Sequence, residues 1–292
     1  MHILITDSGV GGLSVCAYAE RFVRTHGFNE PVRLTFANAA PENDYGYNSM
    51  PSRELKLQTF DRFLRNVTER YAPDFIYVAC NTLSVLLPDT PYFQEAVIPV
   101  KGIVETGSEL LVPELEADPR TAAMIFGTQT TIDAGAYPRL LEARGVEASR
   151  IISQACPGLA DTISEDRKGV KTRSEIVRWV GAAVEKMQHT DAPVVACLAC
   201  THYGYRKDFF AGALADAGIR ARVVNPNERA VDDLFGTRLD AGAKMNREVE
   251  VEFVTRYAIP KTTVEALTWF LSDLSPRTVA AMKNFIHLPD LF

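Results

Sequence analysis

Two similar stretches decide the fold that we predict, Ile3-Leu-Ile-Thr-Asp-Ser-Gly9 and Ala123-Met-Ile-Phe-Gly-Thr-Gln129. Each is a short apolar run that passes into a polar loop, and the two lie 120 residues apart. Cys80 and Cys200 are separated by the same 120 residues, and each directly follows an apolar run. In a repetitive chain, one shared offset can be a coincidence. The other interpretation is two similar halves, each offering one thiol to a common cleft at the carboxyl ends of its strands.

Apolar runs alternate with segments of helical period along the chain, which is typical of α/β proteins with largely parallel sheets. We expect strands near residues 3–5, 32–36, 75–79, 122–126, 150–152, 194–198 and 222–224, and helices near 11–24, 52–71, 134–143, 171–187 and 228–239. The predicted fold class is therefore α/β, with two similar lobes related by a pseudo-twofold axis and the active site in the cleft between them. We place the first lobe at residues 1–103 and 227–292 and the second at residues 104–226.

The composition is that of a globular protein, with 292 residues of which 47% are hydrophobic and 23% are charged. The 31 basic and 37 acidic side chains give a net charge of −6, so nucleic acid is not an expected partner. No apolar run approaches the ~20 residues that cross a bilayer, and we expect a cytoplasmic protein without a membrane partner. The five cysteines are an odd number, which argues against a disulfide framework.

A glycine-rich loop, Asp7-Ser-Gly-Val-Gly-Gly12, follows the first apolar run and precedes a predicted helix. Its glycines allow backbone amides to approach an anion, but their spacing is not that of a dinucleotide-binding fingerprint. The commoner role of an Asp in such a turn is a helix cap. Because Asp7 stands at the carboxyl end of a strand, it is also a candidate base or orienting group.

Cys80 and Cys200 are candidate reactive thiols because backbone amides at a helix start can stabilise a thiolate. A lone cysteine after a buried strand is more often an inert small hydrophobe, so the pair carries more weight than either residue. Cys197-x-x-Cys200-x-His202 also resembles half of a zinc site or a redox pair. Both alternatives fit poorly, because a second ligand pair is missing and Cys197 lies inside an apolar run. Cys16 and Cys156 are interpreted as structural.

Three motifs together resemble a known family, and these are Asp7-Ser-Gly-Val-Gly-Gly-Leu-Ser14, Ala79-Cys-Asn-Thr82 and Ala199-Cys-Thr-His-Tyr203. In this order and spacing they closely resemble the glutamate racemases of the aspartate/glutamate racemase superfamily. Weaker similarity extends to about Arg256. The resemblance implies a racemase that works without pyridoxal phosphate and supplies D-glutamate for cell-wall peptidoglycan. In such an enzyme two cysteines flank Cα, one removing a proton and the other supplying one.

Residue by residue, the resemblance assigns Cys80 and Cys200 as the two acid/bases, with Asp7 beside Cys80 and His202 beside Cys200. It also implies a set of substrate-binding positions, which are Ser8, Tyr45, Gly46, Asn81, Thr82, Thr131 and Thr201. It implies neither a cofactor nor a metal. The expected partner is a small acidic amino acid, and a homodimer is an allowed assembly.

The chain departs from the family pattern at three places. Where the family runs Gly-Asp-Thr-Ala-Arg and then Pro-Tyr-Gly, this chain has Ala37-Asn-Ala-Ala-Pro41 and then Asp44-Tyr-Gly46. Asp44 adds a negative charge beside the expected binding turn, and Leu83 is larger than the residue expected there. Two alternatives therefore stay open: a related racemase or isomerase of the superfamily with a different acidic substrate, and an inactive amino-acid-binding homologue.

Overall fold

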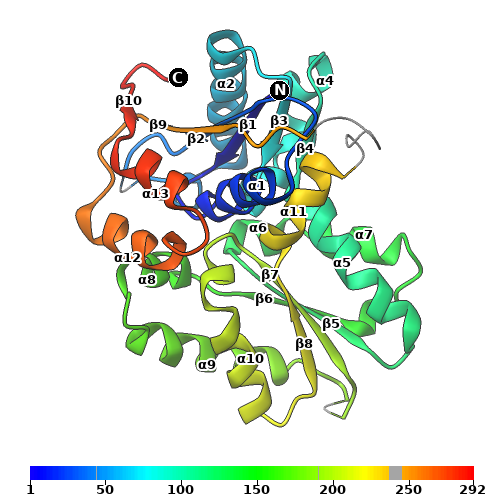
Figure 1. Ribbon diagram of the computed structural model, residues 1–292. Helices are drawn as coiled ribbons and strands as arrows, with labels where there is room; N and C mark the ends of the chain where they lie inside the picture. The colour runs from blue at the N-terminus through cyan, green and yellow to red at the C-terminus, as the bar shows by residue number, and fades with distance from the viewer. Residues whose placement is uncertain (44, 190, 237–244) are drawn as a thin grey trace. The chain divides into compact units, whose positions relative to one another are not determined.

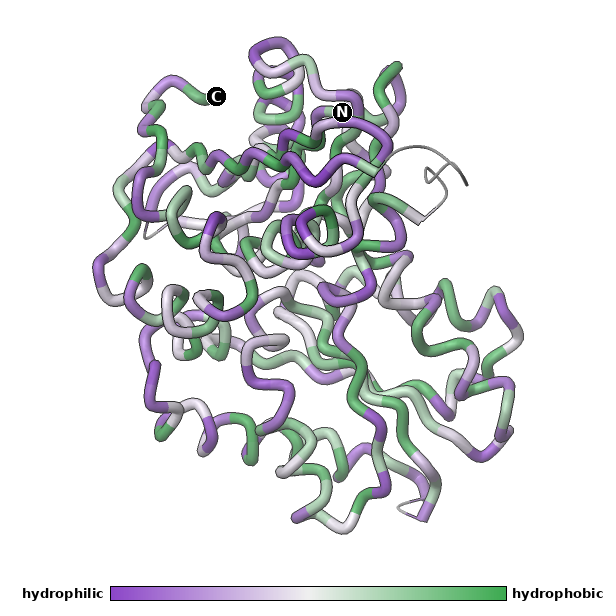
Figure 2. The backbone as a smooth tube through the Cα atoms, in the orientation of Figure 1, coloured by the Kyte–Doolittle hydropathy of each residue, from purple (hydrophilic) through white to green (hydrophobic). Residues whose placement is uncertain are grey.

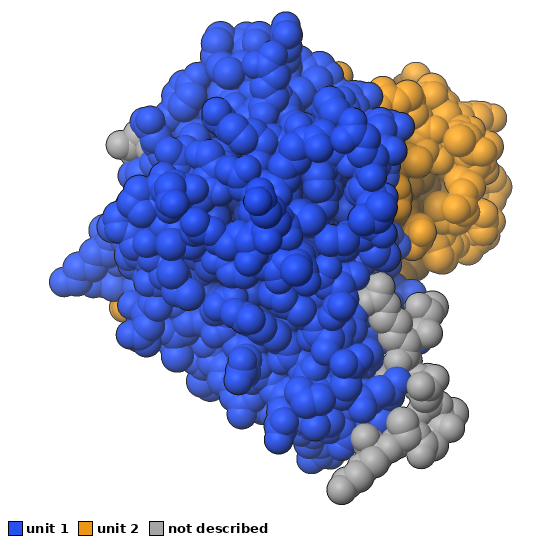
Figure 3. Space-filling model, turned by 90° about the horizontal axis from the view of Figure 1, so that it is seen from above, with its two compact units in different colours: residues 1–103, 227–292 blue, residues 104–226 orange. Residues whose placement is uncertain are grey.

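A computed structural model describes residues 1–43, 45–189, 191–236 and 245–292 of the chain. The chain forms two compact units, coloured separately in Figure 3. Unit 1 contains Met1–Ile103 and Asn227–Phe292, and unit 2 contains Val104–Pro226. Each unit is an α/β structure around one parallel sheet (Figure 1), which confirms the predicted fold class.

The sheet of unit 1 has six strands in the order β10-β9-β2-β1-β3-β4, and every pairing between them is parallel. The strands are β1 (His2–Asp7), β2 (Val32–Asn38), β3 (Phe75–Val78), β4 (Val100–Gly102), β9 (Val249–Thr255) and β10 (Ile286–His287). Its helices are α1 (Leu13–His26), α2 (Arg53–Tyr71), α3 (Asn81–Ser84), α4 (Pro91–Glu95), α11 (Pro226–Phe235), α12 (Lys261–Leu271) and α13 (Pro276–Lys283). The segment after residue 226 thus completes the sheet that the first hundred residues begin.

The longest helix of unit 1, α2, shows how local sequence produces an element. Ser52 caps its start by accepting a hydrogen bond from the Leu55 amide at 3.2 Å. Phe60 and Phe63 lie on its buried face, together with Leu64, and pack into the hydrophobic core beside the sheet. The apolar period of the sequence therefore identified this helix, because one face had to leave water.

The sheet of unit 2 has four parallel strands in the order β6-β5-β7-β8. They are β5 (Ala122–Gly127), β6 (Ile151–Ala155), β7 (Val194–Ala199) and β8 (Ala221–Val224). The helices are α5 (Ile103–Ala117), α6 (Gln129–Asp133), α7 (Ala136–Glu142), α8 (Leu159–Glu165), α9 (Val170–Val184) and α10 (Lys207–Asp216). Both central strands are buried along their whole length. They therefore read as continuous apolar runs, visible as hydrophobic stretches in Figure 2.

The two sheets share one topology at their centres. Strands β2-β1-β3-β4 in unit 1 have the same order as β6-β5-β7-β8 in unit 2. The register is also the same: β1 pairs with β3, and β5 with β7, through residues that are 72 positions apart. Extending that register past the strand ends sets Ser8 opposite Cys80 and Thr128 opposite Cys200.

The sequence expectations differ from the structure at several element ends. The helix expected at 11–24 begins at Leu13, because the loop before it continues to Gly12. The helix expected at 228–239 spans Pro226–Phe235, and its last predicted residues fall outside the described ones. Strands β4, β9 and β10 lie outside the predicted strand ranges, and helices α3, α4, α5, α6, α8, α10, α12 and α13 lie outside the predicted helix ranges. Strand β9 alternates Val and Glu over Val249–Val251, so it lacks the apolar run that revealed the other strands.

No helix among the described residues is both long and apolar enough to span a membrane.

Candidate active site

Strand β1 and the loop after it place a carboxylate at the carboxyl end of the first sheet, since the carboxylate belongs to the last residue of the strand. Asp7 is the last residue of β1 and is 2% exposed. The N-cap position of α1 is held by Gly12, so Asp7 does not occupy it. A Cβ atom on Gly12 would lie 2.8 Å from Asp7 Oδ2, so only glycine lets the helix start this close to the carboxylate.

Cys80 follows β3 and lies beside this loop. Its Sγ is 3.0 Å from Ser8 Oγ and accepts a hydrogen bond from the Leu83 amide at 3.4 Å. Burial raises the pKa of the Cys80 thiol to about 12, and the nearby Asp7 carboxylate acts in the same direction. The hydrogen bonds from Ser8 and Leu83 oppose this rise in pKa. In this state Cys80 is a neutral thiol at physiological pH, so it can supply a proton.

Other predicted positions of unit 1 lie close to Cys80 in the chain or in space. Asn81 and Thr82 form the first turn of α3 directly after it, and both are 2% exposed. Gly46 lies near Ser8, because a Cβ atom added there would be 4.0 Å from the Ser8 carbonyl oxygen. Tyr45 is 37% exposed and forms an isolated antiparallel bridge with Glu42.

Unit 2 repeats this construction with Cys200 after β7. Cys200 is 6% exposed, Thr201 is buried and His202 is half-buried. The Thr131 hydroxyl lies 3.0 Å from that of Thr128, which caps α6 at the end of the neighbouring strand. The predicted residues of unit 2 are thus all placed at the carboxyl ends of its two central strands.

Tyr203 and Gly204 hold the Cys200 loop against unit 2. The buried Tyr203 hydroxyl donates to the carbonyl oxygens of Cys156 at 3.1 Å and of Gly127 at 3.4 Å. A Cβ atom on Gly204 would lie 2.6 Å from the Asn225 side chain, so this position requires glycine. These contacts make the loop a fixed platform for Cys200.

Curated relatives match much of this chain. Glutamate racemase from Methylococcus capsulatus is 30% identical over 247 residues, which cover 84% of this chain and 82% of the relative. The enzyme of that name from Syntrophus aciditrophicus is 31% identical over 208 residues, covering 68% and 67%. The chain belongs to the glutamate racemase family. This family consists of isomerases, and the resemblance predicted from the three motifs is confirmed.

The other comparisons concern shorter matches and the fold. The match to glutamate racemase from Chlorobaculum tepidum is 26% identical over 204 residues and spans 66% of that relative. No family model matches the chain. The solved glutamate racemase from Campylobacter jejuni superposes with a TM-score of 0.71 at 21% identity, covering 92% of this chain and 98% of the other. This member of the glutamate racemase family therefore also shares the fold of solved members.

The three remaining cysteines of this family member are buried. Cys197 lies within β7, is fully buried, and has a thiol pKa raised to about 12 by burial. Cys16 is fully buried in α1, and Cys156 is 1% exposed after β6. None of the five cysteines, all of which lie among the described residues, forms a disulfide bond. The described residues contain no group of three or more His, Cys, Asp or Glu side chains that could hold a metal ion.

Two of the three departures from the family pattern have structural explanations. The buried Asn38 side chain donates to the Tyr257 hydroxyl at 3.0 Å and accepts from the Ala40 amide at 3.0 Å. Leu83 places its side chain in the hydrophobic core, while its amide donates to Cys80. Asp44 lies outside the described residues.

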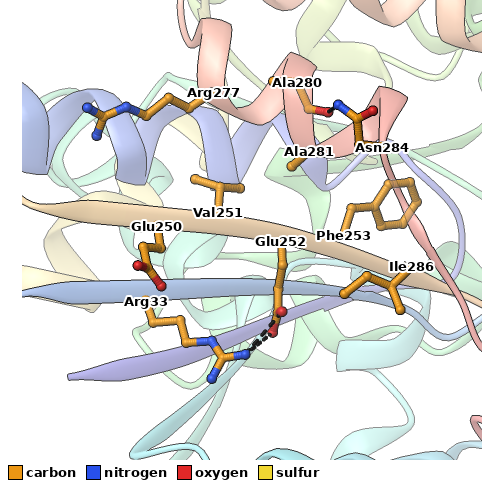
Figure 4. A pocket seen from close by; sticks show the side chains of 10 residues that line it. All are labelled: Arg33, Glu250, Val251, Glu252, Phe253, Arg277, Ala280, Ala281, Asn284 and Ile286. Atoms are coloured by element: carbon orange, nitrogen blue, oxygen red, sulfur yellow. Dashed lines mark hydrogen bonds and ion pairs between the residues drawn. The ribbon is translucent and has the colours of Figure 1, made fainter.

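Unit 1 also has an open cavity of about 530 Å³ along β9 and α13 (Figure 4). In Figure 4, Phe253 points toward α13, whereas Glu252 points toward Arg33, with which it forms an ion pair at 2.9 Å. The described residues that line this cavity include none of the predicted site residues. It is a groove at the edge of the sheet, separate from the Cys80 site.

Proposed function

We propose that this protein interconverts L- and D-glutamate by proton transfer at Cα between the thiols of Cys80 and Cys200. The observation that carries the proposal is the matched register, which sets one cysteine at the same place in two sheets of the same central topology. Membership of the glutamate racemase family supports glutamate as the substrate. The departures at Asn38 and Leu83 are compatible with glutamate as the substrate, because Asn38 bonds Tyr257 and Leu83 packs in the core.

The proposed reaction needs one thiolate and one thiol on opposite faces of Cα. The thiolate takes the Cα proton and becomes a thiol, leaving a carbanion. The opposite thiol then gives its proton to the other face of Cα and becomes a thiolate. The net result is inversion with no change in the proton count, and two groups of one kind serve both directions of reaction.

Asp7 and His202 are proposed to set the protonation of the two thiols. The pKa of Cys80 is raised by burial and by Asp7, so forming its thiolate requires a nearby proton acceptor. The Asp7 carboxylate is placed for this role at the adjoining strand end. His202 lies two residues after Cys200, and an imidazole exchanges protons readily near neutral pH.

The remaining predicted residues are proposed to bind the substrate. Hydroxyl and amide groups suit the two carboxylates and the ammonium group of glutamate, and fixed dipoles stabilise the charge that develops at Cα. We assign this role to Ser8, Tyr45, Gly46, Asn81, Thr82, Thr131 and Thr201. The homodimer and the cytoplasmic location stay predictions.

Racemisation in D2O tests the two-thiol proposal. Because different groups remove and supply the proton, deuterium should enter the product enantiomer while the unreacted enantiomer keeps its proton at early times. Cys80→Ser and Cys200→Ser should each abolish racemisation, whereas the buried strand variant Cys197→Ala should retain it. Equal deuterium in both enantiomers would point to a single base. Exchange with another amino acid but not with glutamate would transfer the proposal to that substrate, and no exchange with any would favour the binding homologue.

A further inference from the structure

Tyr47 is a buried tyrosine whose hydroxyl has no hydrogen-bond partner among the described residues. Its side chain is 1% exposed, and it begins a short 3-10 helix (Tyr47–Ser49) directly after Gly46. Buried polar groups are nearly always paired, so a lone hydroxyl at this depth calls for an explanation. The sequence motif stopped at Gly46, and for this reason Tyr47 was not predicted.

Tyr92 of the same core cluster provides the comparison. It is 6% exposed, and its hydroxyl lies 2.6 Å from the Thr68 hydroxyl. Both tyrosines pack in one cluster of buried residues, yet only the Tyr47 hydroxyl is left without a partner. Packing therefore accounts for the ring of Tyr47, which meets Phe60 edge-on at 6.2 Å, but not for its hydroxyl.

Cys80 belongs to the same buried cluster as Tyr47. The two residues share the core cluster, and Gly46, which precedes Tyr47, lies beside Ser8, whose hydroxyl contacts the Cys80 sulfur. Burial raises the pKa of Tyr47 well above its ordinary value, and a charge on Cys80 raises it further, whereas the positive charge of Arg62 acts in the opposite direction. The Tyr47 hydroxyl consequently keeps its proton when Cys80 loses one, and toward a thiolate it acts as the donor.

We propose that Tyr47 is a positioning residue whose hydroxyl donates a hydrogen bond to the Cys80 sulfur when the thiolate forms. The inference rests on the proposed role of Cys80 as an acid/base. The sulfur already has the Ser8 hydroxyl and the backbone amides of Ser8 and Leu83 as hydrogen-bonding groups, and the anion gains one further donor at a buried position. This explains why the Tyr47 hydroxyl is unpaired while Cys80 is a neutral thiol, because catalytic hydrogen bonds often form only when charge develops.

The test compares Tyr47→Phe with Tyr92→Phe. In the whole protein, alkylation of Cys80 by the neutral reagent iodoacetamide is followed by mass spectrometry at a fixed pH near 9. Below the thiol pKa this rate is proportional to the thiolate fraction, so loss of one donor to the anion should slow it about 10- to 100-fold in Tyr47→Phe. Tyr92→Phe should leave the rate unchanged.

Thermal unfolding gives a second readout with the opposite sign. Tyr47→Phe removes an unpaired buried hydroxyl and should keep or raise Tm, whereas Tyr92→Phe loses the bond to Thr68 and should lower it. Slower alkylation with an unchanged or higher Tm supports the proposal. An unchanged alkylation rate in Tyr47→Phe, or a lower Tm, would overturn it. The alkylation readout needs no turnover, so failure of racemisation in the D2O experiment would be a separate result.

Discussion

Replacement of Ser8 by alanine tests how this fold sets the charge on Cys80. The Ser8 hydroxyl lies 3.0 Å from Cys80 Sγ and is one of the groups that lower the pKa of the thiol. Burial and Asp7 act against it and hold that pKa at about 12. Without the hydroxyl, the thiolate keeps the backbone amides of Ser8 and Leu83 as donors but loses the side-chain donor, so the pKa of Cys80 should rise further.

The size of the effect follows from the strength of the bond. A hydrogen bond to a charged group contributes about 1.5 to 3 kcal/mol, and one pKa unit corresponds to about 1.4 kcal/mol. The pKa of Cys80 should therefore rise by about one to two units in Ser8→Ala. At any pH below the thiol pKa, that change means about 10- to 100-fold less thiolate.

The assay is the rate of Cys80 alkylation by iodoacetamide at fixed pH, together with kcat for glutamate racemisation. Both should fall in Ser8→Ala by about the same factor. Ser14→Ala is the matched control, since the Ser14 hydroxyl is buried but bonds Gly11 and Asn227 instead of sulfur. The control should lower Tm without changing alkylation. An alkylation rate in Ser8→Ala equal to that of the unaltered protein would refute the reasoning.

Three further predictions concern stability. Because burial raises the pKa of thiols such as Cys16 to about 12, the unfolded state loses these protons first as the pH rises above about 9. Tm should therefore fall between pH 9 and 11, and this fall should be less steep in Cys16→Ala. Equal slopes of Tm against pH in the variant and the unaltered protein would contradict this. Gly12→Ala sets a Cβ atom 2.8 Å from Asp7 Oδ2 and should lower the free energy of unfolding by about 1 to 3 kcal/mol in urea titrations, so an unaltered midpoint would argue against the contact. Lys101→Met removes the partly buried ion pair of Lys101 Nζ with Asp233 at 2.6 Å, and we expect the free energy of unfolding in urea titrations to fall by about 1 to 2 kcal/mol. A higher free energy of unfolding would show that the ion pair does not stabilise the fold.

The sequence located the two candidate thiols but did not reveal the packing around them. Cys80 and Cys200 were recognisable because each follows a continuous apolar run and stands in a short motif. Asn38 and Leu83 were read from the sequence as departures that leave the substrate open. The structure adds that Asn38 is bonded to Tyr257, more than two hundred residues away in the chain, and that Leu83 lies in the core. Their roles depend on distant segments, which a single sequence does not reveal.

The amino-acid sequence alone determined the α/β class and the central strands, because burial of one surface imposes a local period on the residues. It also showed the offset of 120 residues between Cys80 and Cys200. Tertiary structure decided strand order, the register that brings Ser8 to Cys80, and the depth at which Tyr47 is buried. It also decided the pKa of Cys80, which depends on exclusion of water and on a charge brought from another strand. The local pattern of apolar residues indicates which surface of an element is buried. The pairing of distant strands, and the pKa shifts that this pairing causes, arise only when the chain is folded.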